Sequence, residues 1–356
     1  MTGRGIDQIL PTFSDPTLYE DYVRDARDYV ALAERRSGAI ERGVALAHVW
    51  GDARTELEQV APHARIINLE TAVTTQEQPW PAKGVHYRMH PANAPVVAAA
   101  RIDCCVLANN HVLDWGRPGL CETLDVLRPL CRTCGAGRDL ASASAPATID
   151  LDDGRRVLVF GCGSPSSGIP ADWAAQADRS GVRLVRERSL HDADAIVTNV
   201  RRHRRAGDVV VVSIHWGGNW GFAIPPEQRS FAHRLVESGA VDVVHGHSSH
   251  HVKAFEVHAG KLILYGCGDF LTDYEGIGGH ELYRSELALM FFPLLDPATG
   301  ELLELHLSPM RTIRFQSRFA DEADRAWLHT TLARECAPFG IRIDPARNAR
   351  LTAHWS

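Results

Sequence analysis

The chain has 356 residues, 45% hydrophobic and 23% charged, a composition typical of a soluble globular protein that buries a large core. Its formal charge of -6 comes without a stripe of basic side chains, which argues against binding to nucleic acid. No apolar run is long enough to span a bilayer, and the start of the chain lacks the hydrophobic segment of a signal peptide. We therefore expect a cytoplasmic protein with no membrane span, whose eight cysteines are free thiols.

In the first half of the chain, two predicted strands run directly into polar side chains. The patterns predict helices over residues 16–36, 52–60 and 119–130, strands over 64–70 and 102–108, and a long aromatic loop over 74–95. The first strand ends at the carboxylate of Glu70. The second strand is apolar on both faces, as interior strands are, and it is followed by Asn110 and His111.

The second half repeats this arrangement with histidines. It predicts strands over 157–160, 208–214, 286–292 and 302–311, a β-hairpin over 253–265, and helices over 226–238 and 322–337. The β-branched strand 208–214 ends at His215. A further short strand over 241–244 leads into a glycine and a cluster that includes His247 and His250. Imidazole is the commonest side-chain ligand of zinc and iron, although a polar loop in a chain with 18 histidines is the alternative interpretation.

Four predicted strand ends therefore carry candidate ligands. These are Glu70, Asn110 with His111, His215, and His247 with His250. Parallel strands align their carboxyl ends at one edge of a sheet, so these groups could converge on one site. Carboxylate, amide and imidazole ligands together suit a pair of divalent ions such as Mn, Fe or Zn. Two such ions about 4 Å apart would lower the pKa of a shared water and hold a phosphoryl group.

Two other motifs are less informative. Cys131 and Cys134 form a single C-x-x-C pair, and without a second pair we favour free thiols over a metal site. The glycine- and serine-rich loop 161–168 lacks the lysine of a phosphate-binding P-loop, so at most it belongs to an active site.

Five short motifs together make the chain resemble a known family. They are Asn68-Leu-Glu70, Ala108-Asn-Asn-His111 with Asp114 and Gly116, Ser213-Ile-His-Trp-Gly217, Gly246-His-Ser-Ser-His250, and Tyr265-Gly-Cys-Gly-Asp-Phe270. Over residues 3–311 the chain resembles the bacterial capsule synthesis family (CapA type, poly-γ-glutamate capsule), a branch of the calcineurin-like metallophosphoesterases.

The resemblance implies a four-layer α/β/β/α sandwich that binds two divalent metal ions (Mn, Fe or Zn). We expect this domain over residues 1–315, followed by a helical extension over 316–356. The implied roles are a bridging carboxylate for Glu70, metal ligation for Asn110, His215, His247 and His250, general acid for His111, and orientation of His111 for Asp114. Arg88, Asn68, Trp216 and Asn219 are the candidates for substrate binding, with packing as the alternative for Trp216 and Asn219.

The chain departs from the family pattern in three places. Asp269 stands where the family usually has asparagine, and Ser248 and Ser249 replace a proline-containing stretch. The family also opens with a strand and a Gly-Asp motif whose aspartate binds the first metal, and this chain begins inside that motif, at Met1. We expect the sandwich to lack this first strand here and the aspartate to be encoded upstream. The alternative is that the short form is real and the first metal binds weakly.

These patterns predict a metal-dependent phosphoesterase-like enzyme that acts on a small phosphorylated or anionic substrate. Amide or acyl chemistry of the γ-glutamyl type is a second interpretation. The third is a catalytically impaired accessory protein of polymer synthesis. Nothing in the sequence defines an oligomeric partner.

Overall fold

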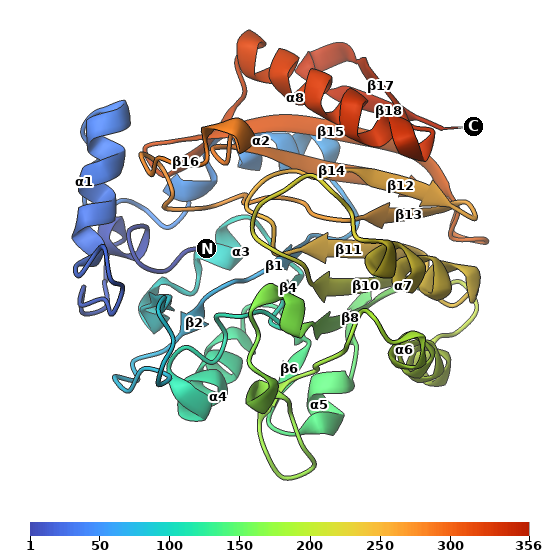
Figure 1. Ribbon diagram of the computed structural model, residues 1–356, viewed down its shortest axis with the longest axis horizontal. Coiled ribbons are helices and arrows are strands. Elements are labelled where there is room, and N and C mark those ends of the chain that lie inside the picture. Colours follow the sequence, from blue (N-terminus) through green and yellow to red (C-terminus); the bar gives the residue numbers. More distant parts are fainter. Residues whose placement is uncertain (356) are drawn as a thin grey trace.

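Three larger β-sheets organise residues 1–355, the part of the chain that the computed structural model describes (Figure 1). The first sheet has the order β1-β4-β5 and is parallel throughout. Its strands are β1 (Ile66–Asn68), β4 (Cys104–Val106) and β5 (Arg132–Cys134). The middle strand β4 is fully buried, which agrees with its apolar sequence on both faces.

The second sheet has six strands in the order β12-β13-β11-β10-β8-β7. They are β7 (Ala147–Asp150), β8 (Arg156–Gly163), β10 (Val209–His215), β11 (Val243–His247), β12 (Phe255–His258) and β13 (Lys261–Leu264). The four inner strands are parallel, whereas the two edge strands pair antiparallel to their neighbours. The carboxyl ends of the inner strands therefore lie at one edge of the sheet.

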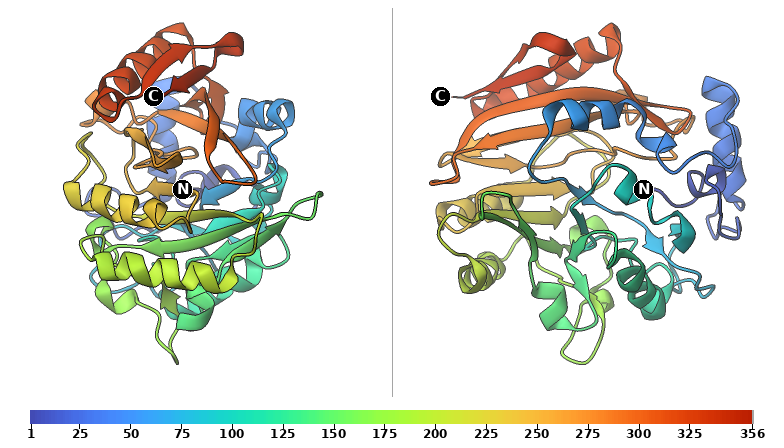
Figure 2. Two further views of the ribbon diagram at one scale, coloured as in Figure 1. Left: turned by 90° about the vertical axis from the view of Figure 1, so that its right-hand side faces the viewer. Right: turned by 180° about the vertical axis from the view of Figure 1, so that it is seen from behind.

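Two amphipathic helices, α6 (Leu190–His203) and α7 (Pro226–Glu237), cover one face of this sheet (Figure 2). The buried residues of α6 recur at helical spacing: Ala193, Ile196, Val197 and Val200. The helix starts where the Ser189 side chain accepts a hydrogen bond from the Asp192 amide. Burying each large aliphatic side chain of this face contributes about 1.5–3 kcal/mol.

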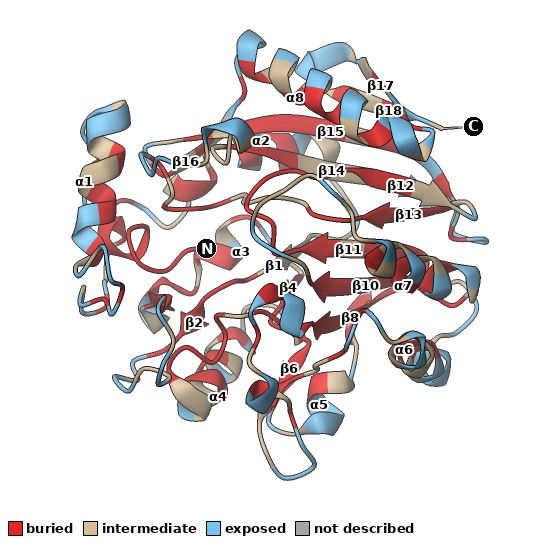
Figure 3. Ribbon diagram, in the orientation of Figure 1, coloured by how far each residue is buried: buried red, intermediate tan, exposed pale blue. Residues whose placement is uncertain are grey.

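The opposite face of the six-stranded sheet shares a core with the third sheet (Figure 3). That sheet has the order β14-β15-β18-β17, and β16 also pairs with β15. Its strands are β14 (Leu287–Leu295), β15 (Leu302–Ile313), β16 (Gln316–Phe319), β17 (Arg342–Pro345) and β18 (Leu351–His354). Helix α8 (Glu322–Cys336) buries Leu328 and Leu332 in the same core.

The remaining helices and short strands lie outside these three sheets, and many of their buried side chains share a further core with β4. They are α1 (Ala26–Ser37), α2 (Gly51–Val60), β2 (Ala72–Val73), β3 (Arg88–Met89), α3 (Val96–Ala99), α4 (Gly116–Leu127), β6 (Ala136–Gly137), α5 (Leu140–Ser144) and β9 (Gly181–Val182), with eight short 3-10 helices among residues 1–355.

Most of the predicted elements are confirmed, but the helix expected over residues 16–36 is wrong in its first half. Helix α1 begins only at Ala26, because the Asp25 carboxylate accepts a hydrogen bond from the Arg27 amide and caps the helix there. Before the cap the chain folds back on itself, and the Leu18 amide donates to the Arg24 carbonyl.

The extension expected to be helical over 316–356 is helical only in part. This segment contains α8, but it also contains β16, β17 and β18, and β18 pairs with β15. Alternating burial of Leu351 and Ala353 marks the last strand. The division of the chain after residue 315 stays a prediction.

A buried ion-pair network fastens the start of the chain to the segment after β13. Arg4 pairs with Asp273 at 2.7 Å and with Glu20 at 2.7 Å, and its guanidinium lies 3.9 Å from the ring centre of Tyr29. The Asp273 carboxylate also accepts a hydrogen bond from the Gly5 amide at 2.9 Å.

We expect Asp273→Ala to lower the free energy of unfolding by about 3–5 kcal/mol, because it removes one of the two carboxylates that pair with the buried Arg4 charge. Urea denaturation of the full chain measures this loss. The control is Arg27→Ala, which removes the exposed pair with Asp25 and should cost less than about 1 kcal/mol. Equal losses in the two variants would contradict the stabilising role of the network.

Candidate metal centre

The centre of the site is a pair of histidines at the ends of two neighbouring parallel strands. In the pairing of β10 with β11, His215 lies opposite His247. Both side chains are buried, and their Nδ1 atoms are 2.8 Å apart. Burial of the valine side chains specifies this register, because a shift by one residue would turn the buried face of a strand outward.

Two residues after the first sheet reach the same histidines. Glu70 follows β1, and Asn110 follows the neighbouring parallel strand β4. The Nε2 atom of His215 is 3.0 Å from the amide oxygen of Asn110 and 4.0 Å from a carboxylate oxygen of Glu70. The same oxygen of Glu70 is 3.9 Å from Nε2 of His111. The first and second sheets therefore meet at this point.

The fifth predicted ligand, His250, lies against a carboxylate that sequence reasoning did not assign to the site. Its Nδ1 atom is 3.0 Å from the Asp269 carboxylate. Burial disfavours the charged form of His250, but the charges of Asp269 and Glu70 outweigh it, and the pKa of His250 is raised. Asp269 follows β13, a further parallel strand of the second sheet. This position after a strand end was the sequence signal that could have identified it as part of the site.

The residues present fit divalent metal ions. Neighbouring donor atoms named above are 2.8 to 4.0 Å apart, and two ligand atoms on one zinc-like ion lie about 3 Å apart. Burial lowers the pKa of His215 and of His247 well below the usual value, so both rings are neutral, as metal ligands must be. Burial also raises the pKa of Glu70 to about 7, and a bound cation would favour the charged form of this carboxylate. The presence and number of ions stay a prediction.

His111 stands beside these donors in a separate dyad. Its Nδ1 atom is 2.7 Å from the Asp114 carboxylate, as expected for a residue that orients it. The Lys83 ammonium, which the sequence did not single out, is 2.8 Å from the other Asp114 oxygen and 3.2 Å from the same ring nitrogen. Burial first, and then the charge of Lys83, lower the pKa of His111 well below its usual value. Lys83 belongs to the long loop 74–95, where a functional residue was to be expected.

Two asparagines hold the donors in place. The Asn68 side-chain amide donates to Glu70 at 2.9 Å, and its oxygen accepts from Asn109 at 3.0 Å. The oxygen of Asn109 in turn accepts from the His111 amide at 3.1 Å. Asn68, expected to bind substrate, is therefore committed to positioning Glu70. Such supporting hydrogen bonds fix the orientation of ligands.

The side chains of two other predicted substrate residues make contacts within the fold. The guanidinium of Arg88 lies 3.9 Å from the ring centre of Trp115 and donates hydrogen bonds to the carbonyls of Gln76 and Asp15. These contacts hold the Arg88 side chain within the fold. Trp216 is buried and donates to the Tyr265 carbonyl at 3.0 Å. Both side chains therefore have structural partners, and their assignment to substrate binding stays a prediction.

Asn219 has an exposed side chain at the rim, and its carbonyl accepts from the His250 amide at 3.0 Å. Its role toward substrate stays a prediction. Met1 lies beside the site as well, where the charges of Asp269 and Glu70 act on its buried amino group. The aspartate expected upstream of Met1 stays a prediction.

Comparisons with known proteins give the family. Residues 1–274 match the family model described as bacterial capsule synthesis protein PGA_cap. The chain is 46% identical over 345 residues to a probable polyglutamine synthesis accessory protein of Mycobacterium tuberculosis, which covers 96% of this chain and 90% of that protein. It is 26% identical over 208 residues to the PGA biosynthesis protein CapA of Bacillus subtilis, covering 58% of this chain and 52% of CapA. Across residues 1–355, none of the helices combines the length and apolar character needed to cross a bilayer. The chain therefore belongs to the bacterial capsule synthesis family that its motifs resemble.

Proposed function

We propose that this protein is a dinuclear-metal-dependent hydrolase of the phosphoesterase type. Its substrate would be a small phosphorylated or otherwise anionic molecule used in poly-γ-glutamate synthesis. One observation carries the proposal: donors from the ends of β1, β4, β10 and β11 converge, with neighbouring donor atoms 2.8 to 4.0 Å apart and the His111 and Asp114 dyad beside them. We also assign the fold to the four-layer α/β/β/α sandwich of the superfamily.

The chemistry follows from this arrangement. Two divalent ions, when bound, would supply a water of lowered pKa and a clamp for phosphoryl oxygens. His111 keeps Nδ1 toward Asp114 and Nε2 toward Glu70, so the protonated ring would present a proton on Nε2 to an oxygen that leaves from the site. The negative charge of a bound substrate favours the protonated ring. Lys83, of which 15% of the side chain is exposed, contributes the positive charge on that side.

We expect Lys83→Met to lower kcat/KM for a phosphorylated substrate about tenfold or more, because a charge-assisted contact contributes about 1.5–3 kcal/mol. Steady-state kinetics measures the loss, and Lys83→Arg should recover part of it. An unchanged kcat/KM in Lys83→Met would show that this cation does not act on the substrate.

A substrate panel tests the function directly. The full chain, loaded with Mn²⁺, is incubated with phosphomonoesters, phosphodiesters and γ-glutamyl amides, and released phosphate, alcohol and amine are measured. Turnover of a phosphoester supports the proposal. Turnover of the amides alone supports metal-dependent acyl chemistry, in which a carbonyl is polarised at the same site.

A second candidate function is a non-catalytic accessory role in polymer synthesis. It is favoured by the name of the M. tuberculosis relative, a probable polyglutamine synthesis accessory protein. Metal content separates the two candidates, because an accessory protein that has lost catalysis need not keep a dinuclear centre.

A further inference from the structure

A second cluster of metal-binding side chains lies at the other end of the six-stranded sheet. Edge strand β12 runs antiparallel to β13, so His258 at its end pairs with Lys261 at the start of β13. The carboxyl ends of the parallel strands, where His215 and His247 stand, lie at the opposite edge. The cluster is therefore separate from the candidate metal centre.

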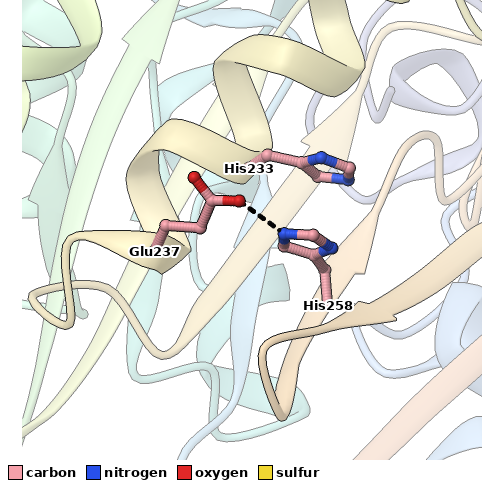
Figure 4. Close-up of side chains that lie close together, drawn as sticks. All are labelled: His233, Glu237 and His258. Carbon is pink, nitrogen blue, oxygen red and sulfur yellow. Dashed lines mark hydrogen bonds and ion pairs between the residues drawn. The ribbon is translucent and has the colours of Figure 1, made fainter.

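Regular spacing brings its members together. His233 and Glu237 are four residues apart on α7 and so share one face of the helix. Glu256 and His258 are two residues apart on β12 and point to the same side of the strand. Helix α7 and strand β12 thus each present one imidazole and one carboxylate to the same place. Figure 4 shows three of these four side chains, His233, Glu237 and His258.

The distances suit a small cation. One ligand atom from each of His233, Glu237 and His258 lies within 4.8 Å of the other two. The Nε2 atom of His258 is 2.8 Å from the Glu237 carboxylate, an interaction drawn in Figure 4. The two imidazoles are stacked, with ring centres 3.6 Å apart and planes 2° from parallel.

Glu256 supplies the support that metal-binding histidines usually have. Its carboxylate is 3.1 Å from Nε2 of His233, which leaves Nδ1 of that ring as the free ligand atom. The same carboxylate accepts a hydrogen bond from the Tyr265 hydroxyl at 2.8 Å and pairs with Arg229 at 3.3 Å. A carboxylate that accepts the second N–H of an imidazole fixes its tautomer and raises its affinity for zinc.

We propose that His233, Glu237 and His258 form a zinc site that joins α7 to β12, with Glu256 orienting His233. Two imidazoles and a carboxylate are a common zinc ligand set, and solvent reaches the half-buried rings to complete a tetrahedral shell. Parallel stacked rings do not aim their lone pairs at one point, so binding requires one ring to turn about χ2. That torsion is broad, and the turn costs little.

The test uses the full chain, stripped of metal with a chelator and dialysed against buffered Zn²⁺. Bound zinc per chain is measured by elemental mass spectrometry. Carbethoxylation mapped by peptide mass spectrometry then reports which histidines zinc protects. We expect His258→Ala and His233→Ala to bind one zinc fewer than the wild type at the same free zinc. Glu237→Gln should raise the half-saturating zinc concentration about tenfold or more.

Two controls make the result specific. His306→Ala removes a comparable half-buried histidine, which lies 3.0 Å from Glu304 but has no third ligand among residues 1–355, and it should bind as much zinc as the wild type. His215→Ala should keep the zinc protection of His258, because the two sites are separate. Equal zinc binding by the wild type, His258→Ala and Glu237→Gln, or carbethoxylation of His258 that zinc does not slow, would overturn the proposal.

Discussion

Replacing His215 with alanine is expected to remove metal and hydrolytic activity together. His215 contacts Asn110 through one ring nitrogen and His247 through the other, so it stands between donors of both sheets. The variant lacks the central ligand of the site. Its metal affinity should therefore fall by more than the roughly 10–100-fold that is lost when a residue supporting a ligand is replaced. Elemental analysis of the purified variant and its turnover of the best phosphoester measure both effects.

The matched control is His245→Ala. His245 is a half-buried histidine on the same strand as His247, and it hydrogen-bonds to Ser213 at 2.9 Å without belonging to the donor set. It should keep the metal content of the wild type. If His215→Ala retained that content while the protein stayed folded by circular dichroism, His215 would not be a ligand.

The second large effect concerns His111. His111→Ala should slow turnover about 10²–10⁴-fold and leave the metal content unchanged, because a general acid acts in the transition state. The loss should be large for an alkyl phosphate and small for a nitrophenyl phosphate, whose leaving group departs without a proton. Comparing kcat for the two substrates isolates the proton transfer from any change in binding.

Asp114→Asn is the companion variant for this prediction. Asp114 contacts His111 at 2.7 Å and is fully buried, so its loss should reproduce part of the effect with the same dependence on leaving group. A His111→Ala variant that slowed both substrates equally, or that lost metal, would contradict the role of general acid.

The sequence predicted that the histidines of β10 and β11 would lie together, because local patterns and topology agree there. The valine-rich segments before His215 and His247 favour strands over helices, and the parallel pairing of these strands places their ends together. Glu70 and Asn110 reach these histidines from a different sheet, so alignment of strand ends within one sheet does not account for their position. The hydrophobic pattern of the strands therefore indicated which polar residues follow strand ends.

What the sequence could not predict depends on contacts between distant segments. Lys83 lies in a loop without periodicity, and only the fold brings it to Asp114. Arg88 belongs to the same loop, yet its guanidinium is taken up by two backbone carbonyls and the ring of Trp115. Asn68 has a polar side chain that could bind substrate. In the structure, its amide nitrogen donates a hydrogen bond to Glu70 and its oxygen accepts one from Asn109.

The strands near the chain end were missed for a similar reason. Strands β17 and β18 are four residues each, too short for a clear alternating pattern beside polar neighbours. Pairing of β18 with β15 stabilises them, and that partner is remote in the sequence. Local propensity alone does not reveal such pairings.

Anomalous X-ray diffraction from crystals of the full chain grown with Mn²⁺ tests the central claim most directly. The account predicts two anomalous peaks about 4 Å apart, surrounded by Glu70, Asn110, His215, His247 and His250. Fewer than two peaks at this position, with the fold intact, would contradict a dinuclear centre.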